Sequence, residues 1–264
     1  MIFQWLRWRR RRRRRRILSQ PFPAEWSEIL DRNVAQFAWL NAAEKEKLRR
    51  ITQVIVAEKY WEGCQGLPMT DEIRVTIAAQ ASLLLLGFDE FYFDRLLSVL
   101  VYPDEYVAPD TFHGPGGLEI ETASPRLGEA WHGGPVILSW PDVLHGGQIP
   151  DDGENVVLHE FAHVLDMHDA GPPDGMPPLE SGEQYRTWVE VMSAEYEVLV
   201  RRADRGRPTL LDHYGATSEA EFFAVATECF FELPRDLLIE HPRLYEVLQA
   251  FYRQDPAARL DNDR

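Results

Sequence analysis

The chain is built around one segment, Val156-Val157-Leu158-His159-Glu160-Phe161-Ala162-His163-Val164-Leu165-Asp166. Read as a helix, this segment is apolar almost all the way round, which is typical of a helix in a protein core. Residues four apart lie one above the other on a helix, so His159 and His163 can bind the same metal ion. Glu160 lies about 100° round the helix from His159. From there its carboxylate can reach a water in the open position of that metal.

The surroundings of this His-Glu-x-x-His pattern favour a metal site over a chance match. Two imidazoles and a carboxylate on so apolar a helix cost on the order of several kcal/mol unless they are paired or bound to a metal. The alternative is that both histidines are hydrogen-bonded in an ordinary core. Catalytic zinc takes imidazole and carboxylate ligands and keeps one position for water, so Zn²⁺ is the predicted cofactor.

A third metal ligand has to come from elsewhere in the chain. The arrangement with a glycine and a third histidine after the pattern is excluded, because Asp166 and Asp169 occupy those positions. Asp169 and His168 could coordinate, but without a glycine the helix has no obvious way to turn back to the metal. Glu221 is the better candidate, because it opens a second apolar helix. Ser218-x-x-Glu221 also fits a capping box, in which Glu221 would bond the backbone of Ser218 instead, and the pattern alone leaves both readings open.

Several pieces of the chain resemble a known family. His159 to Asp166 and Tyr214 to Ala224 are similar to the Mlc titration factor A family of bacterial zinc metallopeptidases, and to the related catalytic domain of anthrax lethal factor. The resemblance to the titration factors extends over most of residues 20–258. It includes, in the same order, Val101-Tyr102-Pro103, Gly134-Pro135-Val136-Ile137-Leu138-Ser139-Trp140 and Phe251-Tyr252-Arg253-Gln254-Asp255-Pro256.

The resemblance implies a role for each matched residue. His159, His163 and Glu221 would be the zinc ligands, and Glu160 the general base. Tyr214 matches a tyrosine that lies near the metal and can donate a hydrogen bond to the developing oxyanion. The family also implies a zincin-like metallopeptidase fold and a second property, the binding of a transcriptional repressor of sugar uptake of the Mlc type.

Two neighbours of these residues have candidate roles of their own. Asp166, one turn beyond His163, could hold the second ring nitrogen of a ligand histidine, or could simply end the helix. His213, beside Tyr214, is an alternative donor to the oxyanion, ranked below Tyr214.

Helical periodicity and a few β-type runs predict an α+β chain, mostly helical, with a small sheet before the metal-binding helix. In that helix Asp152 is expected to be the N-cap. Val136 to Leu138 is expected to be an edge strand that pairs with an extended peptide. The other expected helices span Asn41–Trp61, Thr70 to about Gly87, Ser181–Arg202, Ser218–Phe231 and Pro234–Tyr252, and the other strands Leu96–Tyr102 and Leu118–Glu121.

The chain is expected to form one domain with an appended arm. Residues 1–19 are predicted to be a basic, disordered arm, because the eight consecutive arginines Arg9–Arg16 repel one another. Residues 20–258 are predicted to be a single metallopeptidase domain, helical over about 20–90 and catalytic over about 91–258, and residues 259–264 a tail. The arginine run has no counterpart in the titration factors, so it puts the localisation in doubt but leaves the site prediction intact.

Charge and cysteine content restrict the partners and the compartment. The net charge is −15, and without the nine arginines of residues 1–16 it is −24, which argues against specific nucleic-acid binding. Contact of the arm with an anionic membrane surface is a lesser alternative to a solvated tail. The two cysteines form no disulfide framework, and no apolar run is long enough to span a membrane, so a cytoplasmic protein is expected.

These observations predict a zinc-dependent peptidase. The resemblance to the titration factors implies that its substrates are short peptides and that cleavage could be aminopeptidase-like. The alternative is a non-catalytic regulatory protein that sequesters a transcription factor and holds zinc only for structure, but a protein of that kind would not need a base at Glu160.

Overall fold

The computed structural model of the chain describes residues 2–89, 91–104, 112–113, 119–120, 128–130, 134–167 and 173–261. A four-stranded sheet has the order β1-β2-β6-β5. Strands β1 (Tyr60–Gly63), β2 (Ser98–Tyr102) and β6 (Val136–Ser139) are parallel, and β5 (Gly128–Ala130) runs antiparallel to β6. Together with the predominance of helices, this sheet confirms the α+β class. A separate hairpin pairs β3 (Phe112–His113) with β4 (Glu119–Ile120).

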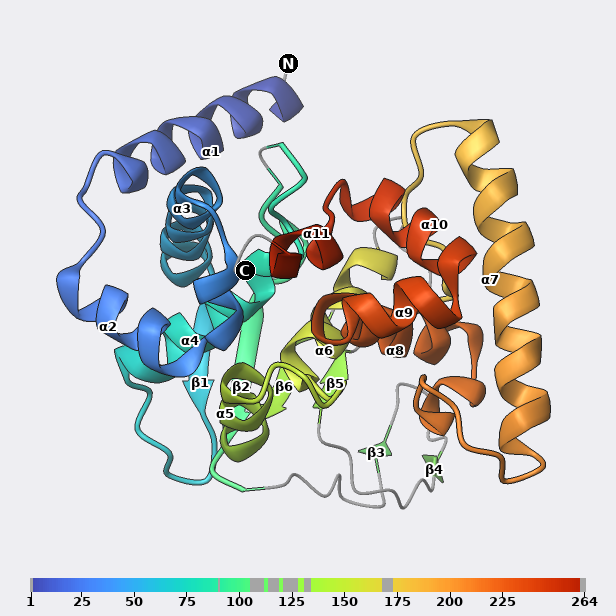
Figure 1. Ribbon diagram of the computed structural model, residues 1–264. Coiled ribbons are helices and arrows are strands. Elements are labelled where there is room, and N and C mark those ends of the chain that lie inside the picture. Colours follow the sequence, from blue (N-terminus) through green and yellow to red (C-terminus); the bar gives the residue numbers. More distant parts are fainter. Residues whose placement is uncertain are drawn as a thin grey trace.

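Helices surround the sheet, and α6 lies near the middle of the molecule (Figure 1). The N-terminal helices lie on one side of α6 and the C-terminal helices on the other. The α-helices are α1 (Ile2–Leu18), α2 (Ala24–Asn33), α3 (Ala42–Glu58), α4 (Asp71–Leu83), α5 (Trp140–Gln148), α6 (Val156–Asp166), α7 (Gly182–Ala203), α8 (Glu219–Glu232), α9 (Pro234–Glu240), α10 (Pro242–Tyr252) and α11 (Pro256–Asp261), and the short 3₁₀ helices are η1 (Ala35–Trp39) and η3 (His213–Ala216). None of the helices in the described part of the chain is long and apolar enough to cross a membrane.

Helix α6 is buried against α8, α4 and β6, as its apolar circumference predicts. Its N-cap, however, is Asn155 and not Asp152. The Asn155 Oδ1 accepts a hydrogen bond from the Leu158 N–H at 3.0 Å. Asp152 instead accepts from the Glu154 N–H and contacts His145, one turn too early to cap the helix.

The prediction that Val136 to Leu138 is an edge strand is wrong. This segment is β6, which pairs with β2 on one side and with β5 on the other. The edge next to β6 is β5, whose Gly-Glu-Ala sequence has neither the alternation nor the branched side chains by which strands are recognised.

The single helix expected from Pro234 to Tyr252 is two helices. Helix α9 ends at Glu240, and α10 begins at Pro242 after the N-cap His241. Proline has no N–H and its ring clashes with the preceding turn, so Pro242 starts a helix here and cannot continue one.

Residues 2–18 are not the disordered arm that the run of like charges predicted. They form helix α1, which lies across α3 and contacts it (Figure 1). Arg14 is only 9% exposed; it bonds Glu58 at 2.6 Å and also pairs with Asp94. Arginine is a good helix former, and these two carboxylates supply the opposite charge that the run itself lacks. The division of the chain into arm, domain and tail remains a prediction.

Candidate metal centre

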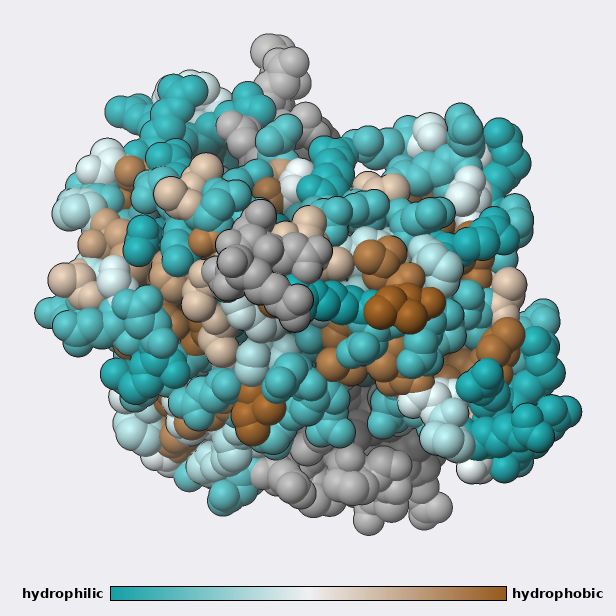
Figure 2. All heavy atoms as spheres, in the orientation of Figure 1, coloured by the Kyte–Doolittle hydropathy of each residue, from teal (hydrophilic) through white to brown (hydrophobic). Residues whose placement is uncertain are grey.

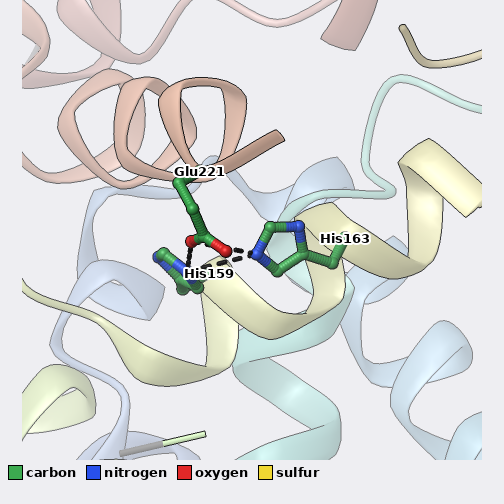
Figure 3. A group of neighbouring side chains, drawn as sticks. All are labelled: His159, His163 and Glu221. Atoms are coloured by element: carbon green, nitrogen blue, oxygen red, sulfur yellow. Dashed lines mark hydrogen bonds and ion pairs between the residues drawn. The ribbon is translucent and has the colours of Figure 1, made fainter. Parts of the chain in front are cut away.

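Two helices bring three side chains to one point (Figure 3). Helix α6 contributes His159 and His163, one turn apart, and α8 contributes Glu221. The Glu221 Oε2 lies 2.9 Å from the His159 Nε2 and 3.3 Å from the His163 Nε2, and the two ring nitrogens are 3.3 Å apart. The three candidate ligand atoms therefore lie within 4.8 Å of one another, close enough to share one ion.

The capping box predicted as the alternative role of Glu221 is only half formed: Ser218 caps the helix, but the Glu221 carboxylate bonds the two histidines and not the Ser218 backbone. The backbone N–H of Glu221 donates to the Ser218 Oγ at 3.2 Å, so Ser218 is the N-cap of α8. The carboxylate of Glu221 points away from that cap toward the two histidines. The cap fixes the first turn of α8 and thereby places the carboxylate over α6.

A fourth residue, Glu228, supports the site and was not predicted. Its Oε1 lies 2.7 Å from the His159 Nδ1, and its Oε2 accepts from the Asn155 backbone N–H at 2.7 Å. A carboxylate at Nδ1 holds the proton there and leaves Nε2 free to bind a metal. The sequence signal was available: Glu228 lies seven residues after Glu221, two turns along the same face of α8.

The charges of the site are strongly coupled. Burial alone would lower the pKa of His159, but the carboxylates of Glu228 and Glu221 raise it well above its usual value. Burial would likewise raise the pKa of Glu221, but the hydrogen bonds from His159 and His163 lower it to about 2. The site thus holds an ionised carboxylate and favours positive charge beside it. Two imidazoles and a carboxylate are ligands that zinc accepts, so the residues fit a metal ion.

Glu160 and Tyr214 both lie near His159. Glu160 is 3% exposed, follows His159 on α6, and helps to raise the pKa of that histidine. Tyr214 is on η3; its side chain is half exposed, and its ring centroid is 6.0 Å from that of His159. Gly215, the next residue, packs so closely on Leu199 and Val225 that a Cβ would lie 3.2 Å from each of their side chains, and this holds the turn against α7 and α8.

Two other predicted neighbours lie elsewhere. The His213 Nε2 is 2.9 Å from the carbonyl oxygen of Arg207, so its ring faces Arg207 and not the histidine pair. Asp166 ends α6, and its Oδ2 accepts from the Gly175 N–H at 2.7 Å; its Oδ1 has no hydrogen-bond partner among the described residues. The predicted bond from Asp166 to a ring nitrogen is therefore not seen, and Glu228 makes that contact to His159. The discarded ligand candidates His168 and Asp169 lie outside the described residues.

A helix that carries His159, Glu160 and His163, faced by a glutamate from a second helix, is the metal-centre arrangement of a metallopeptidase. Comparison with known families agrees with this class. The model of the glucose-regulated metallo-peptidase M90 family matches residues 6–253. The chain therefore belongs to the glucose-regulated metallopeptidase M90 family.

Individual relatives match along almost the whole chain. An uncharacterized protein of Synechocystis sp., slr2042, is 36% identical over 253 residues, which are 96% of this chain and 90% of the relative. Mlc titration factor A of Yersinia pestis is 29% identical over 261 residues, 98% of this chain and 93% of the relative. The protein of the same name from Yersinia pseudotuberculosis matches equally well.

Proposed function

We propose that the protein is a zinc-dependent peptidase of zincin-like fold, with His159, His163 and Glu221 as the metal ligands and Glu160 as the general base. The observation that carries this proposal is the convergence of the three ligand atoms within 4.8 Å, beside a buried Glu160. A purely structural zinc site would be expected to have four protein ligands and no base.

Each residue of the site has a part in the hydrolysis of a peptide bond. Bound zinc would supply a Lewis acid that polarises the scissile carbonyl and makes water acidic. Glu160 then takes the proton of the attacking water and delivers it to the departing amine. The Tyr214 hydroxyl donates a hydrogen bond to the oxyanion as it forms. Glu228 keeps the proton of His159 on Nδ1, so Nε2 is the nitrogen that would hold the ion.

The sheet offers a place for the substrate backbone. Strand β5 is the edge strand next to β6, and β5 packs beside α6. An extended peptide can add to such an edge through main-chain hydrogen bonds. We infer that the substrate lies along β5, that short peptides are preferred, and that cleavage from the amino end fits the family resemblance.

A test of the proposed reaction is Glu160→Gln, which keeps size and shape but cannot accept a proton. Zinc content, measured by metal analysis, should stay at about one ion per chain. Cleavage of a peptide library should fall by roughly 10²–10⁴-fold. The control is Glu154→Gln, an exposed glutamate before the same helix, which should change neither. Undiminished cleavage by Glu160→Gln would contradict the proposed hydrolytic mechanism.

A second candidate function is the binding of a transcriptional repressor. Its support is the name of the Yersinia relatives, Mlc titration factor A. We propose that this protein also binds a repressor of the Mlc type, through a surface that does not depend on Glu160. Calorimetry with a purified repressor of that type should then give the same affinity for the parent protein and for Glu160→Gln. If neither form binds the repressor, this second function fails while the first stands.

A further inference from the structure

Helix α1 has two faces, and one of them is held by the body of the protein. Arg10 and Arg14, four residues apart, both pair with Asp94, and Arg14 also bonds Glu58. The guanidinium of Arg14 lies 4.3 Å from the centroid of the Tyr92 ring. This docked face fixes how the rest of the helix is turned.

The opposite face carries two tryptophans among arginines. Residues 5, 8, 12, 15 and 16 follow the three-and-four spacing of one helix face, about half a turn from residues 10 and 14. Trp5 is 52% and Trp8 is 56% exposed, and Arg12, Arg15 and Arg16 are exposed as well. The guanidinium of Arg12 lies 5.4 Å from the centroid of the Trp8 ring, and that of Arg9 lies 4.4 Å from the Trp5 ring. Large aromatic rings and positive charge therefore occupy the same outward surface.

We propose that this outward face of α1 binds the surface of an anionic lipid bilayer. Tryptophan rings are most stable at the boundary between head groups and acyl chains, and arginines beside them would meet lipid phosphates. If this segment were only a solvated tail, nothing would explain two large apolar rings exposed to water. A double-stranded nucleic acid would attract the arginines, but its bases are already stacked on one another and give no reason for two tryptophans at one end of the same face. The face is narrow, so contact is shallow and the helix lies on the bilayer without crossing it.

The acidic body does not prevent this contact. Figure 1 shows α1 at the outside of the molecule, and in Figure 2 the same region is strongly hydrophilic. An α-helix with its side chains is about 10–12 Å thick. At physiological ionic strength charges are screened over about 8 Å. The body behind α1 is thus farther from the lipid than one screening length, whereas the outward arginines touch it.

The first test measures binding of the full chain to vesicles by co-sedimentation. Vesicles of phosphatidylcholine mixed with phosphatidylglycerol should retain the protein, and vesicles of phosphatidylcholine alone should not. Arg12→Glu, Arg15→Glu and Arg16→Glu combined should weaken binding at least about a hundredfold. The matched control reverses the same number of charges on another exposed site, with Arg201→Glu, Arg202→Glu and Arg205→Glu, and should bind like the parent.

The second test removes the aromatic part. Trp5→Ala with Trp8→Ala should weaken vesicle binding roughly tenfold or more, because less apolar surface enters the head-group layer. Its control removes another exposed apolar pair, Leu238 and Ile239 on α9. Leu238→Ala with Ile239→Ala should bind like the parent.

Three outcomes overturn the proposal. One is equal binding to the two kinds of vesicle, and another is equal binding by the α1 variants and their controls. The third is tight binding of a double-stranded DNA fragment that the charge reversal abolishes, with no vesicle binding. Thermal melting of all four variants should match that of the parent, because the changed side chains point away from the body. The proposal does not depend on peptidase activity, so Glu160→Gln should bind vesicles normally.

Discussion

Helices α1 and α8 each carry a series of like charges, and the protein places them differently. The eight consecutive arginines of α1, Arg9–Arg16, are exposed except Arg14. On α8, Glu221, Glu228 and Glu232 lie seven and four residues apart, so they share the face that packs on α6 and its N-terminal loop. Most of the arginines extend into water, whereas each of the three glutamates bonds specific residues of α6 or of the loop before it.

The glutamates of α8 also show how partners decide the state of a buried charge. Glu221 faces two histidines, and despite burial their hydrogen bonds lower its pKa to about 2. Glu232 meets the amide groups of Asn155 and Gln36, at 3.0 and 3.3 Å, and no cation among the described residues. Burial raises the pKa of Glu232 to about 9, so it is protonated at neutral pH.

The largest expected difference is at the metal ligand. Glu221→Ala should lose most of the bound zinc, because two histidines alone are an incomplete site. The control is Glu219→Ala, which removes an exposed glutamate two residues before Glu221 in the same first turn of α8. This variant should keep its zinc. Metal analysis after gel filtration measures both. Full zinc content in Glu221→Ala would mean that the third ligand is another residue.

The next effect concerns a side chain beside α8. Tyr214→Phe removes a hydroxyl whose proposed role is confined to the transition state, so kcat should fall by about tenfold to a thousandfold while KM and zinc content stay nearly unchanged. Steady-state kinetics on a cleaved peptide gives both constants. A normal kcat per folded molecule, with a lower melting temperature, would make Tyr214 a packing residue.

On α1 the comparison can be made between neighbouring arginines. Arg14→Ala should lower the free energy of unfolding by about 1.5–3 kcal/mol, because it removes the cation that bonds Glu58 and leaves Asp94 with Arg10 alone. Arg12→Ala, two residues away on the exposed face, should change it by less than about 0.5 kcal/mol. Urea unfolding compares the two. Equal values would show that the docked face contributes nothing to stability.

The smallest effect depends on pH. The pKa of Glu232 is raised from its ordinary value to about 9, so the folded state binds a proton that the unfolded state releases above about pH 4.5. Stability from this group is therefore lost as the pH rises toward 9, by up to about 1.4 kcal/mol per unit. Glu232→Gln mimics the protonated form and should lose less stability between pH 7 and pH 8. Glu219→Gln is the exposed control and should follow the parent, and a parallel pH dependence of all three would contradict the assignment.

Sequence patterns succeeded at some positions where the information is local. The His-Glu-x-x-His spacing and the helix start at Thr70 each depend on residues within one or two turns, and α4 begins directly after its N-cap Thr70. The local sequence left two roles open for Glu221, because a glutamate three residues after Ser218 fits both a capping box and a metal ligand at the start of a helix. The choice between the two roles depends on the contact of α8 with α6, which shows that the Glu221 carboxylate lies at the histidines.

Sequence patterns failed where a partner lies far along the chain. Glu58 and Asp94 are 44 and 80 residues from Arg14, and no local pattern pairs them with it. The sequence around Glu228 does not show that its carboxylate contacts His159, because that contact forms only when α8 packs on α6. Strand β5 has a sequence without strand character, and its pairing with β6 defines it. Each miss is a tertiary contact that overrides local propensity.

The candidate ligands come from two helices that are far apart in the sequence, so the ribosome makes them at different times. Glu221 lies 58 residues after His163 in the sequence. At typical rates of synthesis the ribosome needs about 3–12 s to add those residues. During that interval a nascent chain has the histidine pair but only two of the three proposed ligands, and it would not hold zinc tightly. If Glu221 is the third ligand as proposed, metal loading would follow the docking of α8, late in translation or after it, and a partly made chain would stay inactive.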